Sequence, residues 1–229
     1  MKTIGLIGGM SWESSLEYYR KINELVSNRL GGLHSAKCVM YSVDFAEIEA
    51  FQRRGEWHNA AEKLVYAARK LEAAGADYLM ICANTMHKIA GDVQENITIP
   101  LLHIGEAAAA EIQNQKLNKI GLLGTIYTME DTFYKERLEK LGIEVLIPEE
   151  QERKELNRII YEELCHGSFQ KQSKQSILRM MDALMEKGAE GLVLGCTEIP
   201  LIVDAGDHQL PQFNTLDIHV RQAVEQMLT

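Results

Sequence analysis

The sequence predicts an α/β fold of two pseudo-symmetric domains, each a mostly parallel sheet flanked by helices. Two observations predict it. Short apolar runs alternate with longer stretches of helical period along the 229 residues, and three segments of the first half recur in the same order in the second half. Such an alternation is typical of β-α-β units, whose parallel strands are buried on both faces.

The expected strands are short runs in which most residues are apolar. The stretches between them carry apolar residues at intervals of three or four, which predicts helices with one buried face. We expect strands at Thr3–Ile7, Lys37–Val43, Tyr78–Ile81, Leu101–Ile104, Lys119–Leu123, Val145–Ile147 and Gly191–Leu194. We expect helices at Ser14–Arg29, His58–Ala74, Ala107–Gln115, Met129–Leu141, Gln151–His166, Gln172–Lys187 and Leu216–Leu228.

An internal repeat indicates two similar halves. The first repeated segment is an apolar strand that ends in glycine and a small residue. The second is a helix end, a Gly-Ala-acid turn, a buried strand and then a cysteine, and the third surrounds a proline. The matched pairs are Thr3–Gly9 with Lys119–Thr125, Leu71–Thr85 with Leu184–Glu198, and Pro100 with Pro211.

The composition excludes several classes of partner. With 24 Lys and Arg against 33 Asp and Glu, the formal charge is −9, and no basic stripe is present, so we expect neither nucleic acid nor an anionic membrane as a partner. No apolar run approaches the length of a membrane span, and the first residues do not match a secretion signal. The four cysteines are widely separated, without CxxC spacing, which predicts free thiols in the cytoplasm.

Two of the cysteines follow repeated strands. Cys82 and Cys196 each stand where a buried strand ends and polar residues begin. In an open parallel sheet, ligands bind beyond the carboxyl ends of the strands, so two facing halves would bring both thiols to one ligand from opposite sides. A thiolate and a thiol placed in this way could remove a Cα proton from one face and return a proton to the other. Cys38 and Cys165 lack this setting, and we interpret them as structural.

Three motifs carry a resemblance to a known family. The segments IGLIGGMSWES (Ile4–Ser14), ICANTMHK (Ile81–Lys88) and LGCTEIPLI (Leu194–Ile202) together resemble the aspartate/glutamate racemase family, amino-acid racemases that use two cysteines and no cofactor. The resemblance spans nearly the whole chain. It implies an active site in a cleft between domain 1–100 plus 211–229 and domain 101–210, no metal ion or cofactor, an amino-acid substrate and a homodimer.

The resemblance also implies roles for single residues. Cys82 and Cys196 would be the acid/base pair that acts on Cα. The others would contact the α-carboxylate and α-amino group or line the cleft, and Gln52 lies in a polar loop or short helix that could cover it. These expected substrate contacts are Met10, Gln52, Asn84, Thr85, Thr125, Thr128, Thr197 and Glu198.

The sequence departs from the family pattern at two positions. Members associated with aspartate carry an arginine and a lysine that hold the side-chain carboxylate, and here Glu47 and Cys165 stand in those places. An acidic residue there would repel an acidic substrate, so aspartate, glutamate and a broader set that includes homoserine all stay open. Two readings remain beside the racemase. They are a related maleate isomerase, hydantoin racemase or decarboxylase, and a non-catalytic module that binds a small molecule.

Other polar residues suit ordinary structural roles. His87 and His103 could act as acid/base groups on composition alone, yet a histidine beside an apolar run is more often a hydrogen-bonded packing residue. Arg53 and Arg54 could clamp a carboxylate, but neighbouring arginines on a surface helix are usually solvated. We therefore expect none of the four in the site.

Overall fold

The computed structural model describes all 229 residues, which divide into two compact units. Unit 1 comprises residues 1–103 and 219–229, and unit 2 comprises residues 104–218. Each unit contains one four-stranded parallel sheet flanked by helices, so the expected fold class is confirmed. The second domain is expected to end at residue 210, whereas unit 2 ends at residue 218.

The sheet of unit 1 has the strand order β2-β1-β3-β4, and every neighbouring pair is parallel. The central pair is formed by strands whose residues are nearly all fully buried. The strands are β1 (Ile4–Gly8), β2 (Cys38–Ser42), β3 (Tyr78–Ile81) and β4 (Leu101–Leu102). The helices of this part of the chain are α1 (Trp12–Leu30), α2 (Phe45–Arg54), α3 (Trp57–Ala73), the 3-10 helix η1 (Thr85–Ile89), α4 (Ala90–Glu95) and α10 (Thr215–Leu228).

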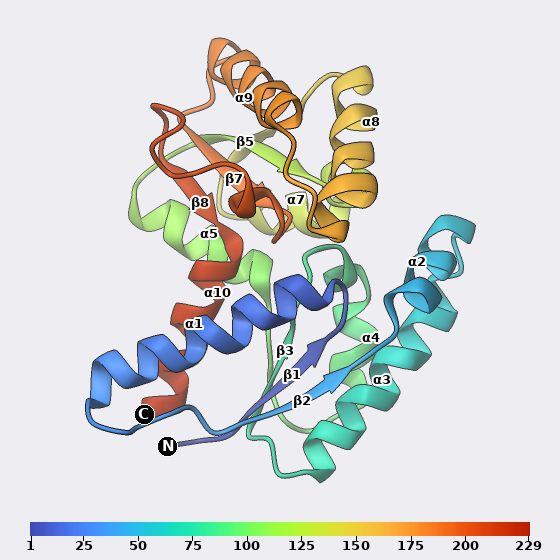
Figure 1. Cartoon of the computed structure of the whole chain (residues 1–229), viewed down its shortest axis with the longest axis vertical. Coiled ribbons are helices and arrows are strands. Elements are labelled where there is room, and N and C mark those ends of the chain that lie inside the picture. The colour runs from blue at the N-terminus through green and yellow to red at the C-terminus, as the bar shows by residue number, and fades with distance from the viewer. The chain divides into compact units, whose positions relative to one another are not determined.

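Helices cover both faces of this sheet (Figure 1). A Cβ on Gly5 would lie 3.2 Å from Leu71 Cβ of α3, whereas a Cβ on Gly8 would lie 3.0 Å from Ser15 Cβ of α1. Because side chains three residues apart on a strand point to opposite faces, α3 and α1 pack on opposite sides of β1. The close approach of α1 explains why Gly8 has no side chain at the end of the strand.

The sheet of unit 2 repeats this topology with the order β6-β5-β7-β8, again all parallel. Its strands are β5 (Lys119–Gly124), β6 (Glu144–Leu146), β7 (Gly191–Gly195) and β8 (Gln212–Asn214). Its α-helices are α5 (Ile104–Asn114), α6 (Ile126–Glu130), α7 (Thr132–Glu139), α8 (Glu150–Arg158) and α9 (Lys171–Glu186). Three further segments are the π-helix η2 (Ile159–Glu163) and the 3-10 helices η3 (Leu164–His166) and η4 (Ile199–Leu201).

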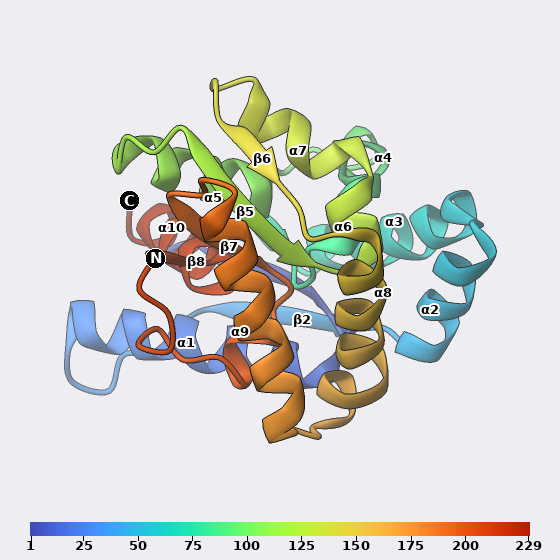
Figure 2. The same ribbon diagram turned by 90° about the horizontal axis from the view of Figure 1, so that it is seen from above.

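Two apolar clusters lie on the two faces of the second sheet. Leu192 and Leu194 pack with residues of α8, η2 and α9, whereas Val193, between them in β7, packs with residues of α5 and α7. Figure 2 shows α8 and α9 on one side of β5 and β7. Each sheet is thus the middle layer of its own three-layer unit with its own buried core.

The repeat that the sequence shows is present in the hydrogen bonds. The carboxylate of Asp77 accepts a bond from Thr3 N–H at 2.6 Å, and that of Glu190 accepts one from Lys119 N–H at 3.1 Å. The matched prolines also act alike, because Pro100 O accepts from Leu79 N–H and Pro211 O from Leu192 N–H, both at 2.9 Å. Each acidic turn therefore ties the start of one central strand to the other.

Several expected elements differ from the structure. The expected strand Leu101–Ile104 ends at Leu102, and Ile104 begins α5. The expected helix Met129–Leu141 is two helices that separate at Asp131, whose ψ of 159° is extended and breaks the helical path. The expected helix Gln151–His166 changes from α to π at Ile159 and to 3-10 at Leu164. The short strand β8 was not expected.

The first and last residues of the described chain lie close together. Lys2 N–H donates a hydrogen bond to Met227 O at 2.9 Å, so helix α10 runs beside the start of β1. Figure 1 shows the two ends of the chain side by side. None of the helices combines the length and the apolar character that crossing a membrane requires.

Candidate active site

Cys82 is the residue directly after β3, and its side chain is fully buried. Its backbone is held from two sides, because Cys82 N–H donates to Ile7 O of β1 at 2.9 Å and Ser14 Oγ of α1 donates to Cys82 O at 3.4 Å. No motif in the sequence indicates the contact of Ser14. The strand pairing and the first turn of α1 together fix the position from which the thiol projects.

The residues after Cys82 form the 3-10 helix η1, and the two expected ones, Asn84 and Thr85, are buried. Met10, two residues beyond β1, is buried as well. Gln52 lies in the last turn of α2, is 3 % exposed, and donates through Nε2 to Met86 Sδ at 3.0 Å. The segment expected as a loop or short helix is therefore helical here, and Gln52 contacts the turn that follows Cys82.

Two glycines bring the corresponding strands of unit 2 together at their carboxyl ends. Gly124 and Gly195 are paired residues, and a Cβ on Gly124 would lie 2.8 Å from Gly195 O. Since Thr125 and Cys196 directly follow this pair, they leave the sheet from adjacent strands. Thr125 is the N-cap of α6, and its Oγ1 accepts from the backbone N–H of the fully buried Thr128 at 3.3 Å.

Cys196 shares a buried carboxylate with its neighbour. The Cys196 thiol donates to Glu198 Oε2 at 2.9 Å, and Thr197 Oγ1 donates to the same oxygen at 3.0 Å. All three side chains are no more than 6 % exposed. Cys165, which is expected to be structural, packs against the apolar cluster that contains Cys196. A third thiol therefore lies close to the cysteine expected to be catalytic.

Both thiols are poor acids in this structure. Burial raises the pKa of the Cys82 thiol. Burial also raises the pKa of the Cys196 thiol, and the negative charge of Glu198 and the nearby Cys165 raise it further. Because the thiolate is the basic and nucleophilic form of cysteine, each sulfur carries its proton until a ligand or a movement changes its surroundings.

Each unit gathers its own expected residues. In unit 1 they lie around the carboxyl ends of β1 and β3 and the end of α2, and in unit 2 around the carboxyl ends of β5 and β7. All ten expected residues are buried although seven of them are polar, and ligand sites in parallel sheets lie at this end of the strands. The structure contains no group of three His, Cys, Asp or Glu side chains that could hold a metal ion.

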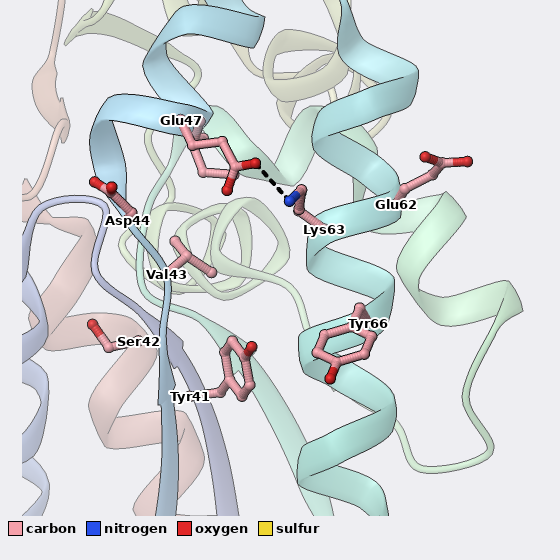
Figure 3. Close-up of a pocket in the computed structure, with 9 residues that line it drawn as sticks. Tyr41, Ser42, Val43, Asp44, Glu47, Glu62, Lys63 and Tyr66 are labelled. Carbon is pink, nitrogen blue, oxygen red and sulfur yellow. Dashed lines mark ion pairs between the residues drawn. The ribbon is translucent and has the colours of Figure 1, made fainter.

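A separate groove of about 450 Å³ lies at the end of β2 (Figure 3). Glu47 of α2 and Lys63 of α3 form an ion pair across it, with Oε1 and Nζ 2.5 Å apart, and the carboxylate raises the pKa of Lys63 above its ordinary value. Tyr41 and Tyr66 lie near the pair, with their rings in edge contact. The carboxylate of Glu47 is thus neutralised by a lysine.

Known proteins resemble this chain over its full length. A family model described as Asp/Glu/Hydantoin racemase matches residues 7–223. A solved protein from Yersinia pestis, described provisionally as an Asp/Glu racemase, is 51 % identical with a TM-score of 0.92, and both chains are covered completely. An aspartate racemase homologue from Pyrococcus horikoshii is 39 % identical with a TM-score of 0.86, again over both complete chains. The broad specificity amino-acid racemase RacX of Bacillus subtilis is 22 % identical over 91 % of this chain and 90 % of its own.

Proposed function

Since the chain belongs to the Asp/Glu/hydantoin racemase family, we propose that it is a cofactor-independent amino-acid racemase. The observation that carries the proposal is the equivalence of the two cysteines. Cys82 directly follows β3 and Cys196 directly follows β7, and these strands hold the same place in two sheets of identical order. A reaction at two faces of one carbon needs two acid/base groups of this kind.

In the proposed reaction, one sulfur as thiolate takes the Cα proton of the bound amino acid. The electron pair left on Cα is delocalised into the substrate carboxylate, whose charge is stabilised by hydrogen bonds from polar side chains and backbone amides. The other sulfur, as thiol, then delivers its proton to the opposite face and becomes the thiolate. The reverse reaction exchanges the roles of Cys82 and Cys196. The proposed substrate contacts are Met10, Gln52, Asn84, Thr85, Thr125, Thr128, Thr197 and Glu198.

The raised thiol pKa values require a step that produces a thiolate. Glu198 already accepts a hydrogen bond from the Cys196 thiol. We propose that Glu198 takes this proton when the ammonium group of the substrate approaches the sulfur. The ammonium group then stabilises the new thiolate. The positive charge of the ligand thus lowers the thiol pKa that burial and Glu198 raise.

We propose a broad set of substrates. The relative from Bacillus subtilis is named as a broad specificity racemase. In addition, Glu47 is paired with Lys63, so the two charges compensate and neither selects strongly for an acidic or a basic side chain. Neutral amino acids such as homoserine, together with aspartate and glutamate, form the set to be tested.

Two further properties belong to the proposal. All four cysteines are free thiols, which supports a reducing, cytoplasmic location. Helix α1 exposes Trp12, Leu16 and Tyr19 by 65 %, 54 % and 49 %, and their spacing places them on one stripe of the helix. We propose that a second copy of the chain covers this stripe in a homodimer.

The test of the racemase is hydrogen exchange in D2O. Each enantiomer of homoserine, aspartate, glutamate and the other common amino acids is incubated with the protein, and loss of the Cα proton is followed by NMR. We expect exchange from both enantiomers, accompanied by inversion. A hydantoin is included because the family model names that substrate class. If no enantiomer exchanges, the chain does not catalyse this reaction.

A further inference from the structure

Unit 1 contains a buried cluster of aromatic and titratable side chains beside the turn that follows Cys82. The cluster consists of Tyr18, His87, His103 and His219, none of which is more than 5 % exposed. The ring centroids of His87 and His103 are 4.5 Å apart, and those of His87 and His219 are 5.8 Å apart. Tyr18 of α1 meets His219 of α10 edge-on at 5.8 Å. The proposed reaction uses none of these four residues.

The 3-10 conformation of η1 explains why a histidine stands at position 87. In an α-helix, His87 N–H would donate to the carbonyl four residues earlier, that of Ala83. In η1 it donates to Asn84 O instead, at 3.0 Å. The Ala83 carbonyl therefore lacks the helical donor, and the His87 ring supplies one, with Nδ1 2.7 Å from Ala83 O. A side chain thus completes the hydrogen bonding of the residue next to Cys82.

The hydrogen-bond partners assign the ring protons. A carbonyl oxygen only accepts, so His87 Nδ1 carries a proton and donates to Ala83 O. For the same reason His219 Nε2 donates to Leu102 O, at 2.9 Å. Burial lowers the pKa of His219 to about 3, so its other nitrogen is unprotonated and accepts from the Tyr18 hydroxyl at 3.0 Å. Helices α1 and α10 therefore hold the ring that packs against His87.

We propose that His87 is a positioning residue for Cys82 and that the Tyr18–His219 pair keeps its ring in place. Three backbone groups then fix the thiol. Cys82 N–H is bound to β1 and Cys82 O to Ser14, and the carbonyl of the next residue is bound to His87. This assignment rests on the proposed function, in which Cys82 exchanges a proton with Cα. A displacement of about 1 Å at a reacting group can lower a rate by about 100-fold.

The first experiment compares three variants at position 87 by steady-state Cα exchange. His87→Phe keeps a ring without the donor, and we expect kcat to fall about 10- to 100-fold with KM changed less than about threefold. His87→Asn places an amide N–H where Nδ1 lies, and we expect kcat to return to within about threefold of the wild type. His87→Gln has a longer side chain, so its amide N–H lies farther from the backbone than Nδ1 does. This variant remains a test if His87→Phe does not fold. We expect it to resemble the donor-less variant.

The second experiment needs no racemase activity. Alkylation of Cys82 and Cys196 by iodoacetamide is followed in the same samples by peptide mass spectrometry. Loss of the His87 donor should open the turn locally, so we expect Cys82 to react about tenfold faster in His87→Phe while Cys196 is unchanged. His87→Asn should match the wild type. Cys196 is the control for unfolding of the whole chain, and Cys38 in β2 is the control for general unfolding of unit 1, which would accelerate Cys38 together with Cys82.

The outcomes separate the positioning role from the proposed function. If the wild type exchanges no Cα proton, the racemase proposal fails, and the alkylation rates still decide the role of His87. Three results would each overturn the positioning role of His87. They are equal acceleration of both thiols, a His87→Asn variant as impaired as His87→Phe, and unchanged rates in all variants. Slower exchange combined with faster Cys82 alkylation in His87→Phe, and rescue in His87→Asn, would establish it.

Discussion

The Cys196 sulfur lies 2.9 Å from Oε2 of Glu198, and both side chains are buried. A thiol that donates to a carboxylate loses its proton less readily, because the thiolate would face a second negative charge. Removing that charge should therefore lower the thiol pKa. This relationship makes Glu198 the residue through which the acidity of Cys196 can be changed without touching the sulfur.

We expect Glu198→Gln to accelerate alkylation of Cys196 at pH 8, since a larger fraction of the sulfur is then thiolate. The measurement is the rate of iodoacetamide labelling of the Cys196 peptide between pH 6 and 10, and the rate should be higher in the variant than in the wild type at each pH. Glu186→Gln, at an exposed position on α9, is the matched control. An unchanged or lower labelling rate in Glu198→Gln would show that the carboxylate does not control this thiol.

The two-base reaction predicts different losses for inversion and for exchange. Cys82→Ser and Cys196→Ser should each lower racemisation at least about 1,000-fold, because a serine hydroxyl is a far weaker acid than a thiol. Each variant can still exchange the Cα proton of one enantiomer through the remaining cysteine. Chiral chromatography and NMR in D2O measure the two quantities side by side. Cys38→Ser, in β2, should stay within about twofold of wild type.

Full racemisation by either single variant would contradict the pairing of Cys82 with Cys196. Loss of exchange from both enantiomers in both variants would contradict it as well. The pattern that supports it is opposite enantiomer preference in the two variants.

The Glu47–Lys63 pair gives a prediction on substrate choice. In Glu47→Gln the ammonium group of Lys63 loses its carboxylate partner, so an acidic ligand should be attracted more strongly. We expect kcat/KM for aspartate relative to homoserine to rise about tenfold. Lys63→Gln should shift the ratio in the opposite direction, and Glu62→Gln, which lines the same groove, is the control. A ratio that stays constant in both variants would separate this groove from substrate selection.

We expect a side chain at Gly195 to lower the free energy of unfolding, because the neighbouring strand leaves no room for it. In Gly195→Ala the new methyl group would lie 2.9 Å from Leu122 Cδ1 and 3.0 Å from Leu123 O. Overpacking of this kind costs about 1–3 kcal/mol of the free energy of unfolding, measured by urea denaturation. Gly206→Ala is the control, since no atom lies within 4 Å of its added Cβ. Equal stability of the two variants would mean that the strands separate without cost.

We expect the free energy of unfolding to depend on pH because His219 is buried in its neutral form. Its pKa is about 3 in the folded chain and about 6.5 when unfolded, so below pH 6.5 the unfolded state binds a proton that the folded state does not. Stability therefore falls as the pH falls, by about 1.4 kcal/mol per unit for this one group. Between pH 7.5 and 5.5, the wild type should lose about 1.4 kcal/mol more than His219→Gln. His34→Gln, at an exposed position, is the matched control.

Much of the fold could be predicted because the central strands are almost entirely buried and most of their residues are apolar. Tyr78–Ile81 has the expected bounds, and the other early strands differ by one or two residues. Strand β8 could not be predicted in this way, since only Phe213 of its three residues is buried and its pairing with β7 defines it. The helix break at Asp131 could not be predicted either, because a polar residue on a helix surface and a new N-cap look alike in sequence.

The site was predictable as far as residue type and repeat could indicate it. The cysteines and their polar neighbours stand in the motifs themselves, and their burial follows from their place at the strand ends. The contacts of Ser14 and His87 with the Cys82 turn depend on the path of α1 and on the 3-10 geometry of η1. Neither contact has a sequence pattern that would distinguish it from ordinary turn chemistry.

The discontinuity of unit 1 has a consequence for folding during synthesis. Residues 104–218 form unit 2 and are all made before residues 219–229, which complete unit 1. His219, and Met227 whose carbonyl binds Lys2, therefore leave the ribosome after the whole of unit 2. Nascent chains usually fold their N-terminal domain first. In this chain we expect the reverse order. Unit 2 can fold before the residues of α10 that complete unit 1 have been made.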